Sequence, residues 1–378
     1  MSKSYEYINE KISRGEAVVV NAEEVIDIIK EKGIKEAAEY VDVVTTGTFG
    51  PMCSSGAFLN FGHSNPPIRM SKTYLNDVES YSGIAAVDTY IGATQLSEKD
   101  EKYGGAHVIY DLISGKDIEL KAYSKGSDCY PLKEINTKIN KNTINEAYLY
   151  NPRNCYQNYN AAINSSETSK YTYMGVLTPH MGNINYSTSG ELSPLLNDPL
   201  LKTIGIGTRI FIGGTEGYVS WQGTQFNMLS QRQENGIPNA PSATLALIGD
   251  LKKMSNEFIK PGFFIKYGVS LYVGVGIPIP ILNEEILRYT GISNEEIFTN
   301  LVDYGNEKKV IGKINYKDLQ SGEIEFENKK IKTFSLTSLK KSREIANILK
   351  EKITKGKFFI QKPVECFKEN EPLKKLKR

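Results

Sequence analysis

The residues best suited to chemistry lie in one stretch, Val41 to Met70. It begins as the β run VDVVTT, breaks at Gly47 and continues as a turn rich in small residues. This turn contains Thr46, Thr48, Gly50, Pro51, Cys53, Ser54, Ser55 and Gly56. A strand that enters such a turn leaves backbone N–H groups uncommitted, and a helix beginning there adds the positive end of its dipole. We therefore expect the pKa of the Cys53 thiol to be lowered and the thiol to be nucleophilic.

A second thiol, Cys129, lies in the segment SDCYP directly after Asp128. Residues 106–123 alternate about the turn SGKD, which predicts a hairpin and places Cys129 on a loop beyond a strand. Two loop thiols at the edge of one sheet can serve as a persulfide carrier and a resolving thiol. The alternative is that each is an unrelated small apolar residue, which is the usual role of a cytosolic cysteine.

Histidines and arginines supply the candidates for proton transfer and for anion binding. His63 and His180 lie in polar loops flanked by Pro or Gly, which favours acid–base roles. His107 heads a predicted strand and is expected to be structural. Arg69 and Arg153 can clamp a substrate carboxylate bidentately, and the alternative for each is a structural ion pair.

Small residues are expected to form the wall of a substrate site. The predicted set is Thr48, Gly50, Ser54, Ser55, Gly213 and Gly214, since glycines allow a backbone to approach a ligand closely. The glycines of GTRIFIGG and GTEG match neither the dinucleotide fingerprint nor the P-loop, so they give little support to a nucleotide site. The sequence has no HExxH, CxxC or Cys/His cluster, and we expect no metal ligand set from these motifs.

The elements that position these residues are typical of a mixed α/β fold. A strand at 17–20, a helix from Asn21 to Lys32 and the strand of the opening stretch form a βαβ-like beginning. A helix is predicted after Pro152 and another from Thr337 to about Lys355. We predict a mixed sheet core with Gly-rich loops and a small C-terminal α+β appendage. The expected domains are 1–303 (catalytic), 304–362 (appendage or lid) and 363–378 (basic tail).

The composition is that of an ordinary globular protein, with 378 residues, 40% hydrophobic and 24% charged. The net charge of +2 gives no reason to expect nucleic acid as a partner. No apolar run is long enough to cross a membrane and the N-terminus has no signal-peptide core, so a cytoplasmic location is expected. Reduced thiols are expected there, and the four cysteines are Cys53, Cys129, Cys155 and Cys366.

Four stretches, in order, resemble one known family. They are TTGTFGPMCSSGAFLNFGH (45–63), DCYP (128–131), NPRNCYQNYNAA (151–162) and GIGTRIFIGGTEGYVSWQGTQ (205–225). The chain thereby resembles the homocysteine biosynthesis (HcyBio) family, the L-aspartate semialdehyde sulfurtransferases of methanogens and other anaerobes, over roughly residues 5–359. Many members also carry a C-terminal pair of CBS domains, which this chain is expected to lack.

The resemblance implies sulfur insertion into L-aspartate semialdehyde to give L-homocysteine, a precursor of methionine. It implies Cys129 as main nucleophile and Cys53 as persulfide carrier or resolving thiol, although the two roles can be exchanged. His63 or His180 would then protonate the departing oxygen, and Arg69 and Arg153 would hold the carboxylate. The reductant is expected from outside the chain, from a small ferredoxin-like partner protein.

Several alternatives stay open from the sequence. Cys53, Cys129 and Cys155 can be imagined as three ligands of an iron–sulfur cluster with one open iron, although their spacing matches no ferredoxin run. Otherwise Cys155 is ancillary and Cys366 incidental. A second class of function is a non-catalytic acyl- or CoA-binding α/β module, and a third is a persulfide carrier that relays sulfur to another enzyme. A homo-oligomer is compatible with each of these functions.

Overall fold

The computed structural model describes residues 2–367 and 372–377. Its helices are α1 (Tyr5–Arg14), α2 (Glu24–Tyr40), α3 (Gly105–Ile113), α4 (Pro194–Asn197), α5 (Glu284–Thr290), α6 (Tyr316–Gln320) and α7 (Leu339–Thr354), with short 3₁₀ turns at Gly190–Leu192 and Leu251–Lys253. The strands form five sheets, which confirms the predicted mixed α/β class. No helix in this described part is long and apolar enough to cross a membrane.

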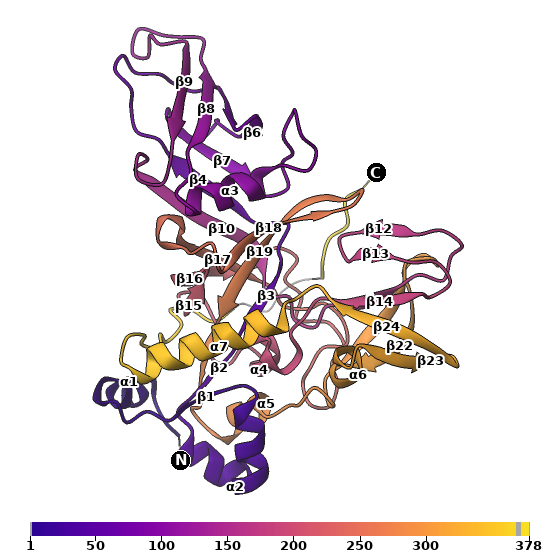
Figure 1. Ribbon diagram of the computed structural model, residues 1–378. Coiled ribbons are helices and arrows are strands. Elements are labelled where there is room, and N and C mark those ends of the chain that lie inside the picture. The colour runs from indigo at the N-terminus through magenta and orange to yellow at the C-terminus, as the bar shows by residue number, and fades with distance from the viewer. Residues whose placement is uncertain (1, 368–371, 378) are drawn as a thin grey trace.

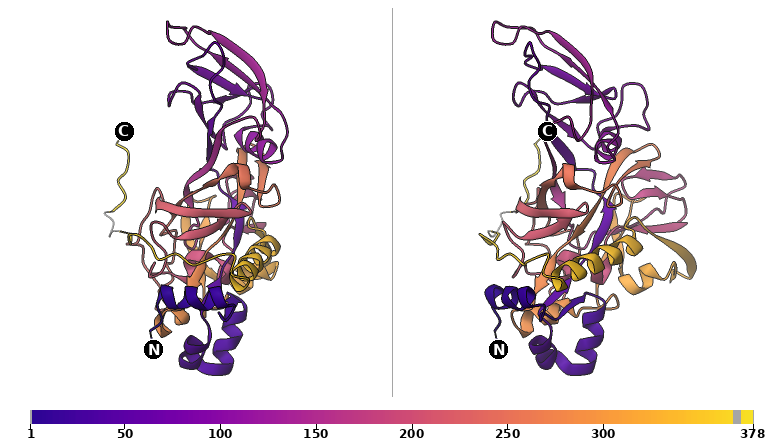
Figure 2. Two further views of the ribbon diagram at one scale, coloured as in Figure 1. Left: turned by 90° about the vertical axis from the view of Figure 1, so that its left-hand side faces the viewer. Right: turned by 60° about the vertical axis from the view of Figure 1, so that its left-hand side comes forward.

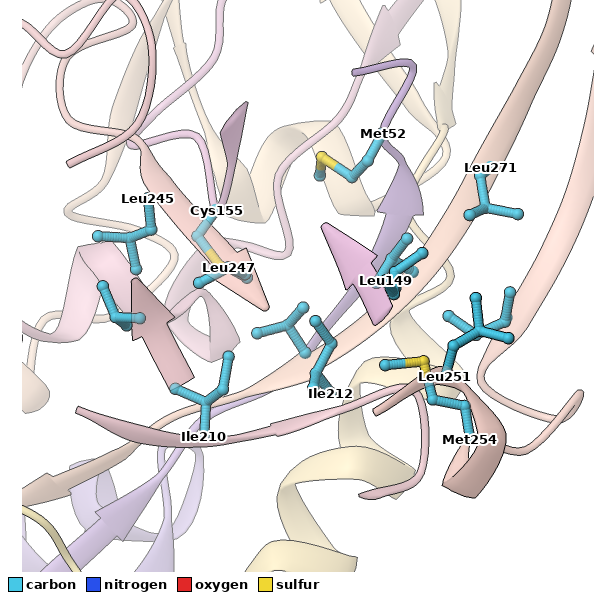
Figure 3. Packing of buried hydrophobic residues seen from close by; sticks show 14 of the residues in the cluster. Met52, Leu149, Cys155, Ile210, Ile212, Leu245, Leu247, Leu251, Met254 and Leu271 are labelled. Atoms are coloured by element: carbon cyan, nitrogen blue, oxygen red, sulfur yellow. The ribbon is translucent and has the colours of Figure 1, made fainter. Parts of the chain in front are cut away.

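A nine-stranded sheet forms the centre of the molecule. Its strands are β18 (Ile259–Phe264), β19 (Gly268–Gly276), β15 (Arg209–Ile212), β16 (Thr215–Gln222), β17 (Leu245–Asp250), β10 (Glu146–Asn154), β4 (Gly56–Asn60) and β7 (Asp88–Gly92), in that order, with β3 (Thr48–Pro51) paired to β19. Near-continuous apolar runs such as VSLYVGVG in β19 suit strands that are covered on both faces. Figure 3 shows part of the main core cluster, which contains Met52, Leu149, Leu247 and Leu271.

Four smaller sheets surround this centre. One contains β1 (Val19–Asn21), β2 (Val43–Thr45) and β20 (Pro278–Pro280), and another β6 (Val78–Ser80), β5 (Lys72–Leu75), β8 (Ile118–Tyr123) and β9 (Glu134–Ile139). The six-stranded sheet contains β22 (Lys309–Asn315), β21 (Phe298–Asp303), β11 (Ala161–Ile163), β14 (Asn183–Tyr186), β24 (Lys329–Ser335) and β23 (Glu323–Phe326). A two-stranded ribbon joins β12 (Lys170–Thr172) to β13 (Gly175–Leu177).

A lobe built by the β6-β5-β8-β9 sheet projects from the body of the molecule. Figures 1 and 2 show it at the top, with α3 at its base and β4, β7 and β10 leading into it. β4 pairs with β10 from Gly56↔Tyr150 to Asn60↔Glu146, so these two strands carry the chain between body and lobe.

The predicted βαβ beginning is confirmed. β1 and β2 pair in parallel with α2 between them, as a helical crossover requires. Gly33 has φ +75° and interrupts α2 directly after Lys32, where the sequence predicts that the helix ends.

Three local predictions are wrong. Residues 106–113 form α3 rather than a strand, because Ala106, Ile109 and Leu112 place apolar side chains on one buried helical face. The chain after Pro152 forms no helix, since positive φ values at Cys155 and Asn158 interrupt the regular geometry. Finally, the turn after Cys53 leads into β4 and not into a helix.

The C-terminal segment is closely joined to the rest of the chain. β22 and β24 pair with β21 and β14, so the six-stranded sheet crosses residue 303, the predicted domain boundary. α7, predicted from Thr337 to Lys355, packs on β3, β19 and β1. Its N-terminus is fixed where the Ser338 N–H donates to the Phe49 carbonyl at 2.9 Å.

The contact between α7 and the opening stretch depends on Gly47. A Cβ atom built there would lie 2.1 Å from the Ser342 carbonyl oxygen on α7. We expect Gly47→Ala to lower the free energy of unfolding by roughly 2 kcal/mol or more, because helix and strand must separate. Urea unfolding followed by circular dichroism measures this. Gly92→Ala is the control, since its Cβ would meet nothing within 4 Å; equal effects of both substitutions would contradict the steric reason.

Candidate functional site

A small cavity of about 70 Å³ lies beside the turn that carries Cys53. β3, the segment after β10, the β12–β13 ribbon, the segment after β14 and the β18–β19 hairpin all contribute to its wall. The lining residues are Thr48, Pro51, Met52, Cys53, Cys155, Tyr156, Tyr159, Tyr173, Met174, Ser187, Thr188, Ser193, Phe264, Tyr267, Ser270 and Leu336. Its volume suits a few water molecules or a small metabolite rather than a nucleotide.

The backbone around Cys53 is firmly held. β3 pairs with β19, and the Met52 N–H extends this ladder by donating to the Leu271 carbonyl at 2.7 Å. The Ser55 N–H and Oγ both donate to the Met52 carbonyl, at 3.0 and 2.7 Å, and Asn151 Nδ2 donates to Ser55 Oγ at 2.7 Å. The tight turn therefore presents Cys53, which is exposed, at a fixed place on the cavity wall.

Arg153 lies next to this turn. Ser54 Oγ donates to the Arg153 carbonyl at 2.9 Å. The guanidinium donates to Thr224 Oγ1 and Gln225 Oε1, both at 2.9 Å, and it interacts with Tyr156, which lines the cavity. These partners are uncharged, so no acidic side chain neutralises the positive charge of Arg153 in the part of the chain that the structure describes.

Tyrosine hydroxyls form one side of the cavity. The Tyr267 hydroxyl is hydrogen bonded to Cys53, and burial together with this neighbour raises the pKa of Tyr267 to about 12. Tyr173 accepts hydrogen bonds from Tyr159 at 3.0 Å and Tyr304 at 2.8 Å. Burial raises the pKa of Tyr159 and Tyr304 as well. Tyr159, Tyr267 and Tyr304 are therefore neutral O–H donors near pH 7.

Cys155 shares the cavity with Cys53 but differs in its surroundings. Only 3% of Cys155 is exposed, and burial raises the pKa of its thiol well above the usual range. Figure 3 shows it among the side chains of the main core cluster. Its backbone has φ +51°, at the point where β10 ends.

Cys129 lies in the projecting lobe and not at the cavity. It is exposed in a turn in which the N–H groups of Ser127 and Tyr130 donate to each other's carbonyls, at 2.9 and 3.1 Å. The ring of His63 stacks on that of Tyr130, with centroids 6.2 Å apart. Arg69 is exposed nearby and lines a separate depression together with Ser127.

The two predicted reactive thiols lie toward opposite ends of β4. Cys53 precedes its first residue, Gly56, whereas His63, beside the Cys129 turn, follows its last residue, Asn60. Five residues of strand span about 16 Å. Figure 1 shows the β8–β9 end of the lobe well away from β3. The structure therefore does not bring Cys53 and Cys129 together at one sheet edge.

The remaining predicted residues lie in different places. Thr48 lines the cavity, and Gly50 lies behind it in β3, where a Cβ would be 2.7 Å from Thr337 Oγ1. His180 is exposed outside the cavity, with Nε2 3.4 Å from a Glu167 carboxylate oxygen. Gly213 and Gly214 form the β15–β16 turn at positive φ, and they are not among the lining residues.

The sequence analysis missed the tyrosines and Ser270. Tyr156, Tyr159, Tyr173 and Tyr267 are scattered among 23 tyrosines, so their number gave no indication of a site. Ser270 had a usable signal, because it is a hydroxyl residue within the otherwise apolar strand β19.

The three cysteines of the predicted cluster are not gathered. Cys53 and Cys155 line one cavity, and Cys129 lies in the lobe. In the described ranges no group of three or more His, Cys, Asp or Glu side chains is placed to hold a metal ion. Cys53, Cys129 and Cys155 therefore do not fit as three ligands of one iron–sulfur cluster in this arrangement.

Comparisons with a family model and with individual proteins agree on one family. The family described as "Homocysteine biosynthesis enzyme, sulfur-incorporation" matches residues 17–360. A protein of Methanosarcina acetivorans named L-aspartate semialdehyde sulfurtransferase is 50% identical over 382 residues, which cover 100% of this chain and 74% of the relative. A protein of the same name from Methanocaldococcus jannaschii is 51% identical over 393 residues, covering 98% and 75%. No solved structure matches the chain.

The cavity geometry predicts unequal cysteine reactivity. A brief pulse of iodoacetamide at neutral pH should alkylate Cys53 and Cys129, whereas Cys155 should react on the order of 100-fold more slowly, because its thiol is buried and the thiolate is the reactive form. Peptide mass spectrometry measures the three rates, and labelling in urea is the control that must make them equal. Labelling of Cys155 as fast as that of Cys53 in the folded protein would contradict the burial.

Proposed function

Because this chain belongs to the homocysteine biosynthesis family, we propose that it is an L-aspartate semialdehyde sulfurtransferase that makes L-homocysteine. The observation that carries this proposal is the position of Cys53. An accessible thiol stands on the wall of a small, hydroxyl-lined cavity, in a chain about half identical to two proteins with that name.

The cavity and its rim suit the proposed substrate. L-aspartate semialdehyde is a four-carbon amino acid with a carboxylate at one end and an aldehyde at the other. Arg153 carries a positive charge at the rim without an acidic partner in the described ranges, so it can bind the carboxylate. Ser54 in the Cys53 turn donates a hydrogen bond to the Arg153 carbonyl, so Arg153 and Cys53 lie on neighbouring segments. A substrate whose carboxylate is bound by Arg153 can therefore extend its aldehyde end toward Cys53.

The chemistry begins at a persulfide on Cys53. Its terminal sulfur attacks the aldehyde carbon, a C–S bond forms, and the carbonyl electron pair moves to oxygen and is protonated. Two electrons and two protons then cleave the S–S bond and release a thiohemiacetal. Loss of water and a second pair of electrons and protons yield the homocysteine thiol. All four electrons come from an external donor, and we propose the ferredoxin-like partner protein for that role.

Neutral hydroxyls assist this addition. Tyr267 donates to the Cys53 sulfur as a neutral phenol, which stabilises a thiolate or persulfide anion. Neither His63 nor His180 lines the cavity, so we assign proton transfer there to the hydroxyl groups rather than to an imidazole. His63 stays a candidate at the Cys129 turn, through Tyr130.

Cys129 is proposed to receive the sulfur and pass it on. In this transfer the Cys53 thiolate attacks the outer sulfur of a Cys129 persulfide and Cys129 leaves as a thiolate. Since the two thiols lie toward opposite ends of β4, we propose that the transfer takes place between two copies of the chain, in a homo-oligomer.

The first test is an anaerobic assay with L-aspartate semialdehyde, a polysulfide as the source of sulfane sulfur and a low-potential reductant. The Cys129 thiolate takes one sulfur atom from the polysulfide, which leaves shorter by one sulfur, so the persulfide forms without an added oxidant. We expect the parent protein to form homocysteine, and Cys53→Ala and Cys129→Ala each to lose at least about 100-fold in rate, because each removes a sulfur-bearing group. Mass spectrometry quantifies the product. Cys366→Ala is the matched thiol control and should retain activity. A parent protein that makes no homocysteine, with the electron-donor partner also supplied, would overturn the proposal.

A second test separates transfer between copies from transfer within one chain. Cys53→Ala and Cys129→Ala proteins, unfolded together and refolded as a mixture, should regain part of the activity, because one copy supplies each thiol. Refolding each variant alone is the control. Activity that stays absent in the mixture, while refolded parent protein is active, would contradict transfer between copies.

A further inference from the structure

One buried side chain at the cavity has no hydrogen-bond partner. Ser270 is only 2% exposed and lines the cavity, and its Oγ meets no donor or acceptor within the described ranges. Two neighbouring hydroxyls at the cavity are paired: Thr188 is hydrogen bonded to Tyr316, and Tyr159 donates to Tyr173.

Ser270 and Cys53 lie on the wall of the same cavity. β3 and β19 pair as Gly50↔Val273 and Pro51↔Tyr272, and the Met52 N–H donates to the Leu271 carbonyl. β3 ends at Pro51, and Cys53 follows in the turn that begins there. The pairing therefore brings the Cys53 turn to the part of β19 that contains Ser270, and a substrate in the cavity can contact both side chains.

An unpaired buried hydroxyl is unfavourable for the fold. A buried polar group without a partner loses its hydrogen bonds to water and gains none in return. An Ala or Val side chain would pack better at this position of β19, where most neighbouring residues are apolar and buried. The hydroxyl therefore contributes little to folding and is free to donate to a molecule in the cavity.

We propose that the Ser270 hydroxyl binds the aldehyde oxygen of the substrate. The inference rests on the proposed function and deepens it. As the sulfur on Cys53 forms its bond to the aldehyde carbon, the carbonyl electron pair moves onto oxygen, and Ser270 donates a hydrogen bond to this developing alkoxide. A fixed donor aimed at the place where charge develops stabilises the transition state more than the ground state.

The test compares Ser270→Ala with the parent protein by kcat/KM and by the midpoint of urea unfolding. Removal of a serine that only supports the fold would lower both values. We expect kcat/KM for L-aspartate semialdehyde to fall on the order of 100-fold, as when one oxyanion donor is removed. The midpoint of urea unfolding should stay the same or rise, because an unpaired hydroxyl is lost. The persulfide on Cys53, measured by mass spectrometry, should form as in the parent.

The matched control is Ser80→Ala, which removes a buried serine whose hydroxyl is bonded to Thr73 and Thr89 outside the cavity. Its unfolding midpoint should fall while kcat/KM stays unchanged. If Ser270→Ala behaves in this way, or leaves kcat/KM within twofold of an active parent, the inference is overturned. An inactive parent would instead count against the proposed function, so the two failures are distinguishable.

Binding of unreactive analogues gives an independent measurement. L-Homoserine keeps an oxygen at the reacting carbon and L-2-aminobutyrate lacks it. The parent should prefer homoserine by about tenfold, and Ser270→Ala should lose this preference, since the preference measures one hydrogen bond. Isothermal titration gives both affinities. An unchanged preference in Ser270→Ala would overturn the assignment of Ser270 to the oxygen.

Discussion

The pairing of β3 with β19 is the interaction on which the rest of the site depends. It places the Cys53 turn directly after a strand that pairs with β19, the strand that contains Ser270, and it fixes the turn through the Met52 N–H. α7 lies directly over these strands, and its contact is close because Gly47 and Gly276 have no side chains. A Cβ at Gly276 would be 2.9 Å from Ile345 on α7. The opening stretch is therefore held in shape by packing against β19 and α7 as well as by the hydrogen bonds of its own turn.

The chemistry of the cavity is dominated by neutral hydroxyls. Tyr159, Tyr173 and Tyr267 line the cavity together with Cys53. Burial raises the pKa of Tyr159 and Tyr267, so both stay protonated near pH 7. Such a wall can donate to an anionic sulfur or to an alkoxide without adding a full charge to a partly closed site. Arg153, whose guanidinium interacts with Tyr156 on the cavity wall, is the cation that we propose for the substrate carboxylate.

The projecting lobe adds a geometric constraint. β4 lies between the Cys53 turn and His63, which stacks beside the Cys129 turn, and Figure 1 shows the lobe extending away from the body of the molecule. In the roles that we propose, Cys129 takes up sulfur at an exposed turn and Cys53 inserts it at the cavity. Separate places for these two steps would keep a persulfide away from the substrate until transfer, which is the advantage we infer for this arrangement.

The sequence by itself determined the mixed α/β class, the βαβ beginning, α7 and the family, because these depend on local periodicity and on residues that follow one another in the chain. It also singled out Cys53 and Arg153, since their segments are rich in turn-forming residues. It mistook α3 for a strand, because eight residues of mixed apolar pattern fit both periods. Tertiary pairing, by contrast, brings Tyr267 and Ser270 to the cavity wall that carries Cys53 and leaves Cys129 in the lobe. Strand register and the direction of β4 set these distances, and both result from pairing between segments far apart in the chain.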